Sequence, residues 1–320
     1  SSPRNLKNTN NLTEKRRNEN CPPFKKNIIS QKLITFFMKT KGIKKRTTFA
    51  QAPLPFQGQK RRFLKEFKEV LKEFPCDTVF VDLFGGSGLL SHTIKTEKPN
   101  ARVIWNDYDN FQRRLELIPI TNEILGNIRP ILQNRTRKSN IDDLKPQIIS
   151  VLKEYSVYDL DYITLSANLV FSGKHACSLG ELMEKRCNFY NVLTKTEYNA
   201  IGYLQGVERV SKCYKELIVE FKDIDNVVFV LDPPYLFTDV KSYNGVGNWK
   251  IGDYLAIVKE LTTKDKYIYF GSNKGQLLDL FDALANDFGI KNPFDGASKL
   301  SVYVGINKGA IYEDLMIYKY

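Results

Sequence analysis

Residues 227–235 read Val-Val-Phe-Val-Leu-Asp-Pro-Pro-Tyr, an apolar run that stops at an acid and two prolines. A run of this length, rich in β-branched and aromatic residues, is typical of a strand in a parallel sheet that is covered on both faces. Proline has no N–H for a central ladder, so the strand must end by Asp232 and the prolines fix the exit loop. The Asp232 carboxylate, the Pro233 carbonyl and the Tyr235 ring therefore lie at the carboxyl edge of the sheet, where open α/β sheets bind ligands. This set suits a flat molecule with an exocyclic amine; the alternative is a structural proline turn with a solvated acid and a packing tyrosine.

Seven stretches of the chain have the pattern of strands, and helical patterns fall between many of them. The predicted strands are Thr78–Leu83, Arg102–Asn106, Glu216–Phe221, Asn226–Leu231, Tyr267–Gly271, Leu300–Ile306 and Asp314–Tyr318. The predicted helices are Gln59–Phe74, Leu89–Thr96, Phe111–Leu117, Ile141–Lys153, Gly252–Leu261 and Lys274–Asn286. Alternation of strand and helix predicts a wound, mostly parallel seven-stranded α/β sheet of the Rossmann-like kind. The last two strands are joined by residues 307–310, which suits a hairpin and makes the final strand antiparallel.

Residues 113–194 do not follow this rhythm. They combine helical pieces with a polar, glycine-containing stretch, so we predict an inserted, mainly helical subdomain. Residues 51–112 and 195–320 then form the domain that contains the sheet. The basic residues of the insertion suit contacts to phosphates and bases. The alternative is that these charges form a solvated face.

Composition excludes several classes of protein. The chain has 320 residues, of which 42% are hydrophobic, and no apolar run approaches the length of a membrane span. No signal peptide is recognisable, so a cytoplasmic location is expected. The five cysteines form no Cys-x-x-Cys pair, and there are only two histidines, so we predict neither a disulfide framework nor a metal site.

The net charge of +12 is concentrated at one end of the chain. Residues 1–50 carry 13 Lys/Arg against 2 Glu, a net +11, which leaves +1 for residues 51–320. We predict that residues 1–50 are a basic, poorly ordered extension. Such a segment could instead bind phosphate groups by releasing counterions.

A glycine-rich turn follows the first predicted strand. It reads Asp82-Leu83-Phe84-Gly85-Gly86-Ser87-Gly88, and its glycines allow a tight turn and close approach of a ligand to the backbone. Gly86, Gly88 and Ser91 also approximate the spacing of a dinucleotide fingerprint, with Asp107 about 20 residues further on. An acid at the strand end would repel a pyrophosphate, however, and suits a ligand with positive charge, such as a sulfonium or an α-amino group. A purely structural turn is the remaining alternative.

Two further segments complete the candidate site. Asp107 ends the second predicted strand, where an acid commonly accepts hydrogen bonds from ribose hydroxyls, and Tyr108 could lie against a nucleobase. The competing role for Asp107 or Asp109 is to cap a helix. Phe56-Gln57-Gly58-Gln59-Lys60 precedes the first predicted helix, and Lys60 could pair with a carboxylate at the same edge.

Together these motifs resemble those of a known family. Pro-Phe-x-Gly-x-Lys (residues 55–60), Asp-Leu-Phe-x-Gly-x-Gly (82–88) and Asp-Pro-Pro-Tyr (232–235) are similar to motifs of the DNA adenine-N6 methyltransferases. The closest group has its target-recognition region between the glycine motif and Asp-Pro-Pro-Tyr, and here 144 positions separate Gly88 from Asp232. The resemblance covers about residues 52–320 and is poor within the insertion.

The resemblance implies S-adenosylmethionine as cofactor and double-stranded DNA as substrate. The implied cofactor-binding residues are Phe56, Lys60, Asp82, Phe84, Gly85, Gly86, Ser87, Gly88, Asp107 and Tyr108. The implied catalytic residues are Asp232, Pro233, Pro234 and Tyr235, with a flipped adenine stacked on Tyr235 and its N6 hydrogens on Asp232 and the Pro233 carbonyl. The candidate DNA contacts in the insertion are Arg135, Arg137, Ser172, Gly173, Lys174 and Arg186.

Several alternatives stay open on the sequence. The acceptor could be the N4 amine of cytosine, adenine in RNA, or a protein glutamine. A catalytically inactive DNA-binding subunit of the same fold is a candidate from another class, and a nicotinamide enzyme is a more distant one. We expect a monomer, and a separately encoded restriction endonuclease is a candidate partner.

Overall fold

The apolar run that precedes Asp232 is a strand at the centre of the sheet. This strand, β4 (Val227–Leu231), is buried at every position and pairs in parallel with β1 (Val79–Asp82). Among the described residues the sheet has seven strands in the order β3-β2-β1-β4-β5-β7-β6. The pairs from β3 to β5 are parallel, whereas β7 is antiparallel to both of its neighbours. The predicted wound, mostly parallel sheet with an antiparallel final strand is confirmed.

The computed structural model describes residues 48–171, 175–234, 250–261, 263–264, 266–272, 277–307 and 310–320. The other strands are β2 (Arg102–Asn106), β3 (Glu208–Val210), β5 (Tyr267–Ser272), β6 (Ser298–Asn307) and β7 (Ala310–Lys319). The α-helices are α2 (Leu64–Leu71), α3 (Leu89–Glu97), α4 (Phe111–Glu116), α5 (Ile118–Ile128), α6 (Lys145–Lys153), α7 (Tyr162–Leu169), α8 (Leu179–Met183), α9 (Tyr214–Phe221), α10 (Ile251–Leu261) and α11 (Leu277–Phe288). Short 3₁₀ turns are η1 (Arg61–Phe63), η2 (Arg129–Leu132), η3 (Asp142–Leu144) and η4 (Val157–Asp159).

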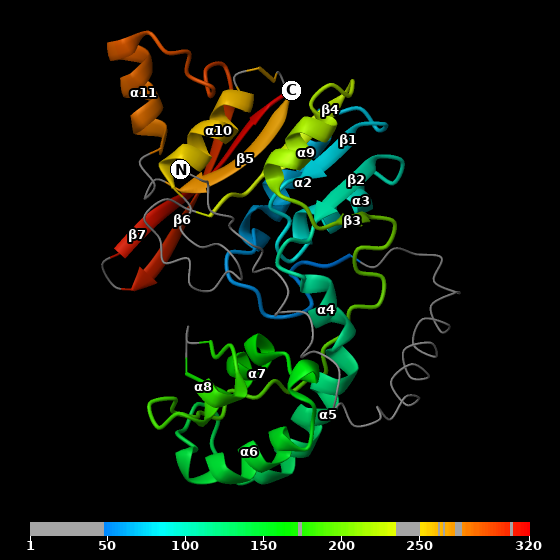
Figure 1. The fold of residues 1–320 in the computed structure, drawn as a ribbon, viewed down its shortest axis with the longest axis vertical. Coiled ribbons are helices and arrows are strands. Elements are labelled where there is room, and N and C mark those ends of the chain that lie inside the picture. Colours follow the sequence, from blue (N-terminus) through cyan, green and yellow to red (C-terminus); the bar gives the residue numbers. More distant parts are fainter. Residues whose placement is uncertain are drawn as a thin grey trace, which may run out of the picture. The chain divides into compact units, whose positions relative to one another are not determined.

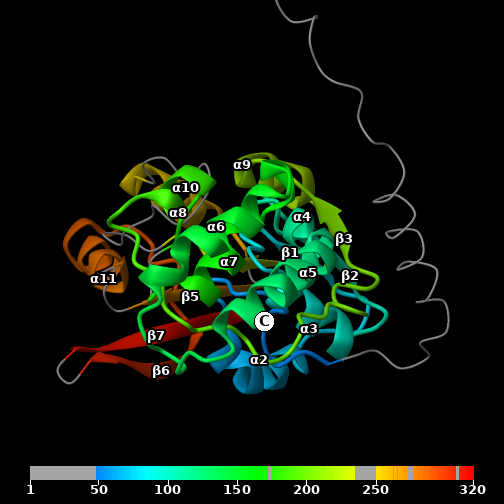
Figure 2. The same ribbon diagram turned by 90° about the horizontal axis from the view of Figure 1, so that it is seen from below.

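Helices cover both faces of the sheet, and the side chains of β4 alternate between them. Val228 and Val230 belong to an apolar core with α2 and α3, whereas Phe229 and Leu231 belong to a second core with α9, α10 and α11. Figure 2 shows α2 and α3 on one side of the strands and α9 and α10 on the other. Burial on both faces explains why β4 lacks an alternating pattern in the sequence.

One strand was predicted at the wrong place. Glu216–Phe221, predicted as a strand, belongs to helix α9, in which Tyr214, Leu217, Ile218 and Phe221 are buried. Their spacing of three, four and seven residues is that of a helix face, but a six-residue window shows too little of it. The strand absent from the prediction is β3, which pairs with β2 at the edge of the sheet. It has three residues, all half-buried or exposed, and no apolar run.

Two predicted helices also begin or end elsewhere. The predicted helix Gln59–Phe74 starts as the 3₁₀ turn η1 and α2 ends at Leu71. In the predicted helix Ile141–Lys153, the α-helical part begins only at Lys145, with Pro at its first turn, where the missing N–H has no cost. The remaining predicted helices agree with the structure to within two residues at each end, apart from the first three residues of Lys274–Asn286, which lie outside the described residues.

The helices α5 to α8 have an apolar core of their own. Ile124, Ile148, Leu165, Leu182 and Phe189 are each fully buried within it. Figure 1 shows these four helices gathered below the sheet, in green shades. Within the described residues, no helix is both long and apolar enough to cross a membrane.

Candidate active site

The three acids singled out in the sequence lie at the carboxyl ends of neighbouring parallel strands. β2, β1 and β4 are adjacent, with Asp82 paired to Trp105 on one side and to Val230 on the other. Asp82 ends β1, Asp107 follows β2, and Asp232 follows β4. Parallel strands end at one edge, so the structure brings these carboxylates to the same side of the sheet.

The glycine turn between β1 and α3 is closely packed against aromatic side chains. Gly86 and Gly88 have φ of 46° and 75°, in the left-handed region that favours glycine. A Cβ on Gly86 would lie 2.9 Å from the Phe56 ring. Gly88 donates its N–H to the Gly85 carbonyl at 2.7 Å, which closes the turn immediately before α3. The Ser87 carbonyl accepts a hydrogen bond from a buried tyrosine, Tyr203, at 2.9 Å. The turn is therefore held in one shape by its own backbone and by the residues packed around it.

Gly85→Ala is expected to destabilise the protein. An added Cβ would lie 2.1 Å from Cδ1 of Trp105, a residue that is 1% exposed and cannot move aside freely. Overpacking of this kind costs about 1–3 kcal/mol, so the melting temperature should fall. Gly126→Ala is the matched control, because a Cβ there meets nothing within 4 Å inside α5 and alanine is the better helix former. Thermal unfolding followed by circular dichroism compares the two; equal melting temperatures would contradict the close packing of the turn.

Asp82 is a buried acid with one oxygen in use. It is 1% exposed, and its Oδ2 accepts a hydrogen bond from Ser91 Oγ at 2.6 Å. Its Oδ1 is buried and has no hydrogen-bond partner among the described residues. Burial raises the pKa of Asp82 to about 7; the hydrogen bond from Ser91 opposes this, the nearby Asp232 carboxylate adds to it, and the Phe84 backbone N–H and the Lys60 cation also lower the pKa. A cationic group placed at Oδ1 would favour the ionised carboxylate.

The carboxylate of Asp107 binds the first backbone N–H groups of helix α4. Its carboxylate accepts hydrogen bonds from the Phe111 N–H at 2.5 Å and the Gln112 N–H at 3.0 Å, and from Nε of Arg209 at 2.7 Å. The competing role foreseen for this acid, at a helix N-terminus, is therefore the one it has here. Its contact with a ribose stays a prediction. The side chain of Tyr108 is 55% exposed beside it, so it is available for stacking on a ligand.

Phe56 links the glycine turn to the Asp107 region. Its ring lies against Gly86, as described above, and packs edge-on against the Phe111 ring with centroids 5.6 Å apart. Phe111 is the residue whose N–H binds Asp107. Phe84 is half-buried, with its ring 5.3 Å from that of Tyr214. The structure thus brings three predicted segments, residues 55–60, 82–88 and 107–108, into one cluster.

Lys60 and Asp232 form an ion pair in which Nζ lies 2.5 Å from Oδ2. Nζ also donates to the Gly58 carbonyl at 2.9 Å and lies 6.0 Å from the centroid of the Phe270 ring. The side chains of Lys60 and Asp232 are 7% and 19% exposed. Burial raises the pKa of Asp232, the Lys60 cation opposes this, and the Asp314 carboxylate adds to it. The structure thus pairs Lys60 with Asp232, and a contact between Lys60 and a carboxylate of the cofactor stays a prediction.

Other predicted site residues lie partly outside the described residues. Pro233 is buried and Pro234 is half-buried, whereas Tyr235 is not among the described residues. The same holds for the predicted DNA contacts Ser172, Gly173 and Lys174.

The remaining predicted DNA contacts are three arginines. Arg135 and Arg186 are ion-paired with Asp143 and Glu184, and Arg137 is exposed. Two of the three cations are therefore partly balanced within the chain, which weakens them as a source of binding energy for phosphate.

Sequence reasoning missed several residues that shape the site. Ser91 was considered only as a position in a dinucleotide fingerprint, but it binds Asp82. Arg209 lies on β3, for which there was no strand signal, and binds both Asp107 and the Asn110 side chain. Arg114 was counted only among the charges of the insertion. No motif marks Arg209 or Arg114, because each acts through contacts that are distant in sequence.

Comparison with known proteins decides the family. The family model for the D12 class N6 adenine-specific DNA methyltransferases matches residues 56–295. This chain belongs to that family. The D12 class chain is also 36% identical over 290 residues to a Haemophilus influenzae protein named "Putative methyltransferase", an alignment that covers 88% of this chain and 96% of the relative.

A solved structure, precorrin-6y C5,15-methyltransferase from Geobacter metallireducens, matches 86% of this chain and all of its own at 11% identity and a TM-score of 0.35. Likeness at that level carries no argument about activity.

The family confirms the resemblance read from the three motifs. It establishes the D12 class chain as a methyltransferase and gives no support to a nicotinamide enzyme. Among the described residues, no group of three or more His, Cys, Asp and Glu side chains could hold a metal ion.

Proposed function

We propose that this chain transfers a methyl group from S-adenosylmethionine to the N6 amine of a flipped adenine, at a specific sequence in double-stranded DNA. The observation that carries the proposal is the neighbouring placement of Asp82 and Asp232. One acid has a buried oxygen with no partner among the described residues, beside a tight glycine turn. The other ends the adjacent strand within Asp-Pro-Pro-Tyr, close enough to raise the pKa of Asp82.

The residues around the glycine turn fit S-adenosylmethionine. This molecule carries an α-amino cation, and the buried Asp82 Oδ1 is an acceptor that such a cation would satisfy. Gly85 and Gly86 are only half-buried, and the half-buried Phe56 and Phe84 offer apolar surface beside them. When bound, the cofactor supplies an electrophilic methyl group on a sulfonium. We propose that Lys60 and Phe56 border its methionine end and that Asp107 and Tyr108 border its nucleoside.

Asp232 is the group that makes the adenine amine reactive in this proposal. The N6 lone pair is delocalised into the purine ring and is a poor nucleophile. The Asp232 carboxylate and the Pro233 carbonyl each accept one N6 hydrogen, which pulls the nitrogen toward a tetrahedral shape and frees its lone pair. As the N–C bond forms, the methyl–sulfur bond would break with its electron pair left on sulfur. The ionised Asp232 stabilises the positive charge that grows on nitrogen, and the methylated amine then loses one N6 proton to solvent. Tyr235 stacks on the flipped base and holds it in place.

Lys60 has a consistent place in this scheme. An ammonium 2.5 Å from Oδ2 favours the ionised form of Asp232 against the effect of burial. Ionised Asp232 is the form that accepts a hydrogen bond from the amine. We infer that Lys60 keeps this acid charged while it waits for substrate.

We further propose that residues 113–194 recognise the DNA and that residues 51–112 and 195–320 carry out the transfer. The separate apolar core of α5 to α8 supports this division, because such a unit can present a surface without disturbing the sheet. Arg137 and the exposed part of Arg135 are the described candidates for phosphate contact.

Nucleoside mass analysis tests the proposed function. The protein is incubated with duplex DNA and S-adenosylmethionine carrying a deuterated methyl group, and the DNA is then hydrolysed to nucleosides. We expect deuterated N6-methyladenine, absent when the cofactor is left out. Exclusive N4-methylcytosine, or product only with RNA, would replace the acceptor assigned here. Cofactor binding without any product would favour an inactive DNA-binding subunit.

A further inference from the structure

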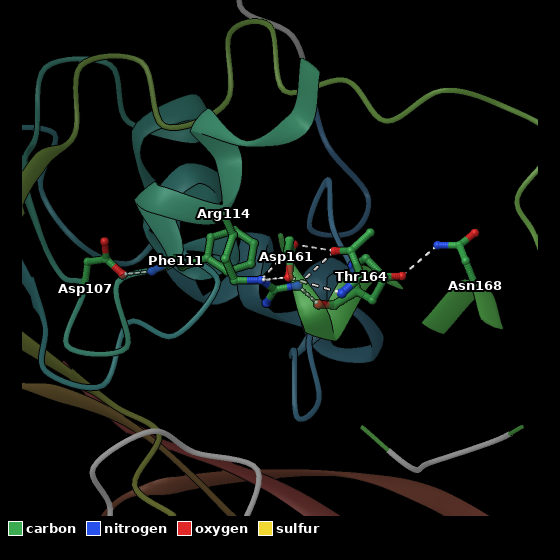
Figure 3. Close-up of polar contacts among 7 residues, drawn as sticks. Asp107, Phe111, Arg114, Asp161, Thr164 and Asn168 are labelled. Atoms are coloured by element: carbon green, nitrogen blue, oxygen red, sulfur yellow. Dashed lines mark hydrogen bonds and ion pairs between the residues drawn. The ribbon is translucent and has the colours of Figure 1, made fainter. Parts of the chain in front are cut away.

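An arginine that is only 12% exposed lies at the centre of a polar cluster outside the proposed reaction centre. Arg114, on α4, donates from Nε to both carboxylate oxygens of Asp161, at 3.0 and 3.1 Å. Its Nη2 donates to the Pro55 carbonyl at 2.8 Å and to Oγ1 of Thr164 at 3.2 Å. The guanidinium carbon also lies 5.1 Å from the centroid of the Phe111 ring. Figure 3 shows Arg114 pointing at Asp161 and Thr164, with Phe111 beside it.

The pair of charges is removed from water. The side chain of Arg114 is 12% exposed and that of Asp161 is 2% exposed. A planar guanidinium that donates from Nε to the Asp161 carboxylate and from Nη2 to Pro55 and Thr164 fixes the angle between these partners as well as the distances, which lysine cannot reproduce. Removing either partner would leave a buried charge without compensation. The cluster therefore admits one arrangement of the elements that it joins.

On one side the cluster holds the loop that shapes the proposed cofactor site. Pro55 directly precedes Phe56, whose ring lies against Gly86 and Phe111. Phe111 is on α4 with Arg114, and its N–H binds Asp107. Arg114 thus fixes the backbone next to Phe56 and belongs to the helix whose start engages Asp107.

On the other side the cluster holds the start of helix α7. Asp161 precedes α7 and accepts from the Thr164 N–H at 3.2 Å and from Thr164 Oγ1 at 2.5 Å. The amide of Asn168, one turn later, donates to the Thr164 carbonyl at 2.8 Å and to the Tyr198 hydroxyl at 2.9 Å. Helix α7 ends at Leu169, and the next residue forms a bridge with Phe189.

His175 gives a second connection between Arg114 and the predicted DNA contacts. His175 directly follows Ser172, Gly173 and Lys174 in the sequence. Burial lowers the pKa of His175, and the positive charge of Arg114 lowers it further. The same guanidinium therefore lies within electrostatic reach of the residue next to the predicted DNA contacts.

We propose that Arg114 is a positioning residue for the methyl transfer, which holds the Phe56 loop at the cofactor site and helix α7 of the recognition region in one fixed arrangement. The inference rests on the proposed function, because it assigns cofactor binding to the first element and DNA recognition to the second. Arg114 touches neither the reacting amine nor the methyl group. Its loss acts through Phe56 on cofactor affinity and through α7 on DNA affinity.

Arg114→Lys is the variant that tests this role. It keeps the positive charge and loses the fork, so one contact among Asp161, Pro55 and Thr164 can be kept but not all of them. We expect the affinity for S-adenosylmethionine, measured by calorimetry, to fall about tenfold, and the KM for DNA to rise by a similar factor. Arg102→Lys is the matched control: Arg102 starts β2, outside the insertion, and pairs with Glu208 at 2.9 Å, but it is 48% exposed. It should leave both constants unchanged.

A merely structural role for Arg114 gives a different result. Partial unfolding would lower the melting temperature and scale kcat by the folded fraction, while the cofactor affinity of the folded molecules and the KM for DNA stay within about twofold. That outcome overturns the proposal.

Further variants keep the two proposals separable. Should Arg114→Lys not fold, Asp161→Asn keeps an acceptor for the Thr164 N–H and removes the charge, and the same two constants are measured. If the wild-type protein methylates no DNA, the proposed function fails, but the effect on cofactor affinity still decides whether Arg114 positions the Phe56 loop. An unchanged cofactor affinity in both variants would reject that part.

Discussion

Asp232→Ala is expected to slow methyl transfer by about 10²- to 10³-fold, while the affinity for S-adenosylmethionine stays within about threefold of wild type. The carboxylate is assigned to the N6 amine and to the charge that grows on nitrogen, so its loss acts on the transition state more than on cofactor binding. Single-turnover incorporation of labelled methyl groups measures the rate, and calorimetry measures cofactor affinity.

The ion pair between Lys60 and Asp232 makes a second variant informative. Asp232→Asn keeps an acceptor oxygen but loses the negative charge that Lys60 and the adenine amine both use. We expect it to be nearly as slow as Asp232→Ala, because the charge carries most of the electrostatic effect. Asp223→Ala is the control, since that carboxylate is 86% exposed, beyond the end of α9, and should leave the rate unchanged. Transfer by Asp232→Ala at close to the wild-type rate would remove Asp232 from the mechanism.

The strands that are buried on both faces of the sheet could be predicted from the sequence. β4 and β5 are apolar at nearly every position because helices cover both faces, and the two prolines after Asp232 mark the end of β4. β3 could not be found this way, because it lies at the sheet edge and its residues are exposed or half-buried. Its place was given to α9, whose helical spacing is hidden in a short apolar stretch.

The candidate site could likewise be predicted only in part. Asp82, the glycine turn and Asp232 follow strands that the sequence marks clearly, so the topology of a parallel sheet brings them to one edge. Their partners could not be predicted. Lys60 and Asp232 are separated by 172 positions, and Arg209 and Asp107 by 102. Such contacts depend on which faces of the sheet the helices cover, and no local pattern carries that information.

The position of Asp107 was predicted correctly, but the sequence does not decide its role. The sequence put an acid at the end of β2, and the structure has it there. Both of its oxygens accept hydrogen bonds from the start of α4, and one also accepts from Arg209. A carboxylate oxygen has two acceptor sites, so a ribose hydroxyl could share it with a backbone N–H. Whether the acid serves the helix alone depends on a ligand, which no sequence pattern supplies.

The affinity for S-adenosylmethionine is expected to depend steeply on pH through Asp82. Because burial raises the pKa of this acid to about 7, it is protonated in the free protein at lower pH. An α-amino cation at Oδ1 favours the ionised form, so binding below about pH 7 must release a proton. Affinity should then rise about tenfold per pH unit up to about pH 7 and level off above it.

In the cofactor-free protein, the contribution of Asp82 to the free energy of unfolding changes in the opposite direction: it falls as the pH rises. A pKa raised from 3.8 to about 7 means that the folded state holds a proton that the unfolded state has lost. The stabilising contribution of Asp82 is therefore complete at low pH and is lost as the pH rises toward about 7. Asp82→Asn should remove this pH dependence of the free energy of unfolding, which denaturant titrations at several pH values would show.

Asp82→Asn should also weaken cofactor binding by about 10- to 100-fold at neutral pH, because the ion pair with the α-amino cation is replaced by a hydrogen bond from that cation to a neutral amide oxygen. Its remaining affinity should be nearly independent of pH between about pH 5.5 and 7.5, a range below the usual pKa of an α-amino group, about 7.7–8.0.

Asp109→Asn is the matched comparison, since burial raises the pKa of Asp109 to about 6 and its Oδ1 also lacks a hydrogen-bond partner among the described residues. Calorimetry in buffers of different ionisation enthalpy counts the protons released on binding. Asp109→Asn should keep the release centred near pH 7 and Asp82→Asn should lose it. If the release persists in Asp82→Asn, the amino group of the cofactor is bound elsewhere, and the part of the site built on β1 has to be reassigned.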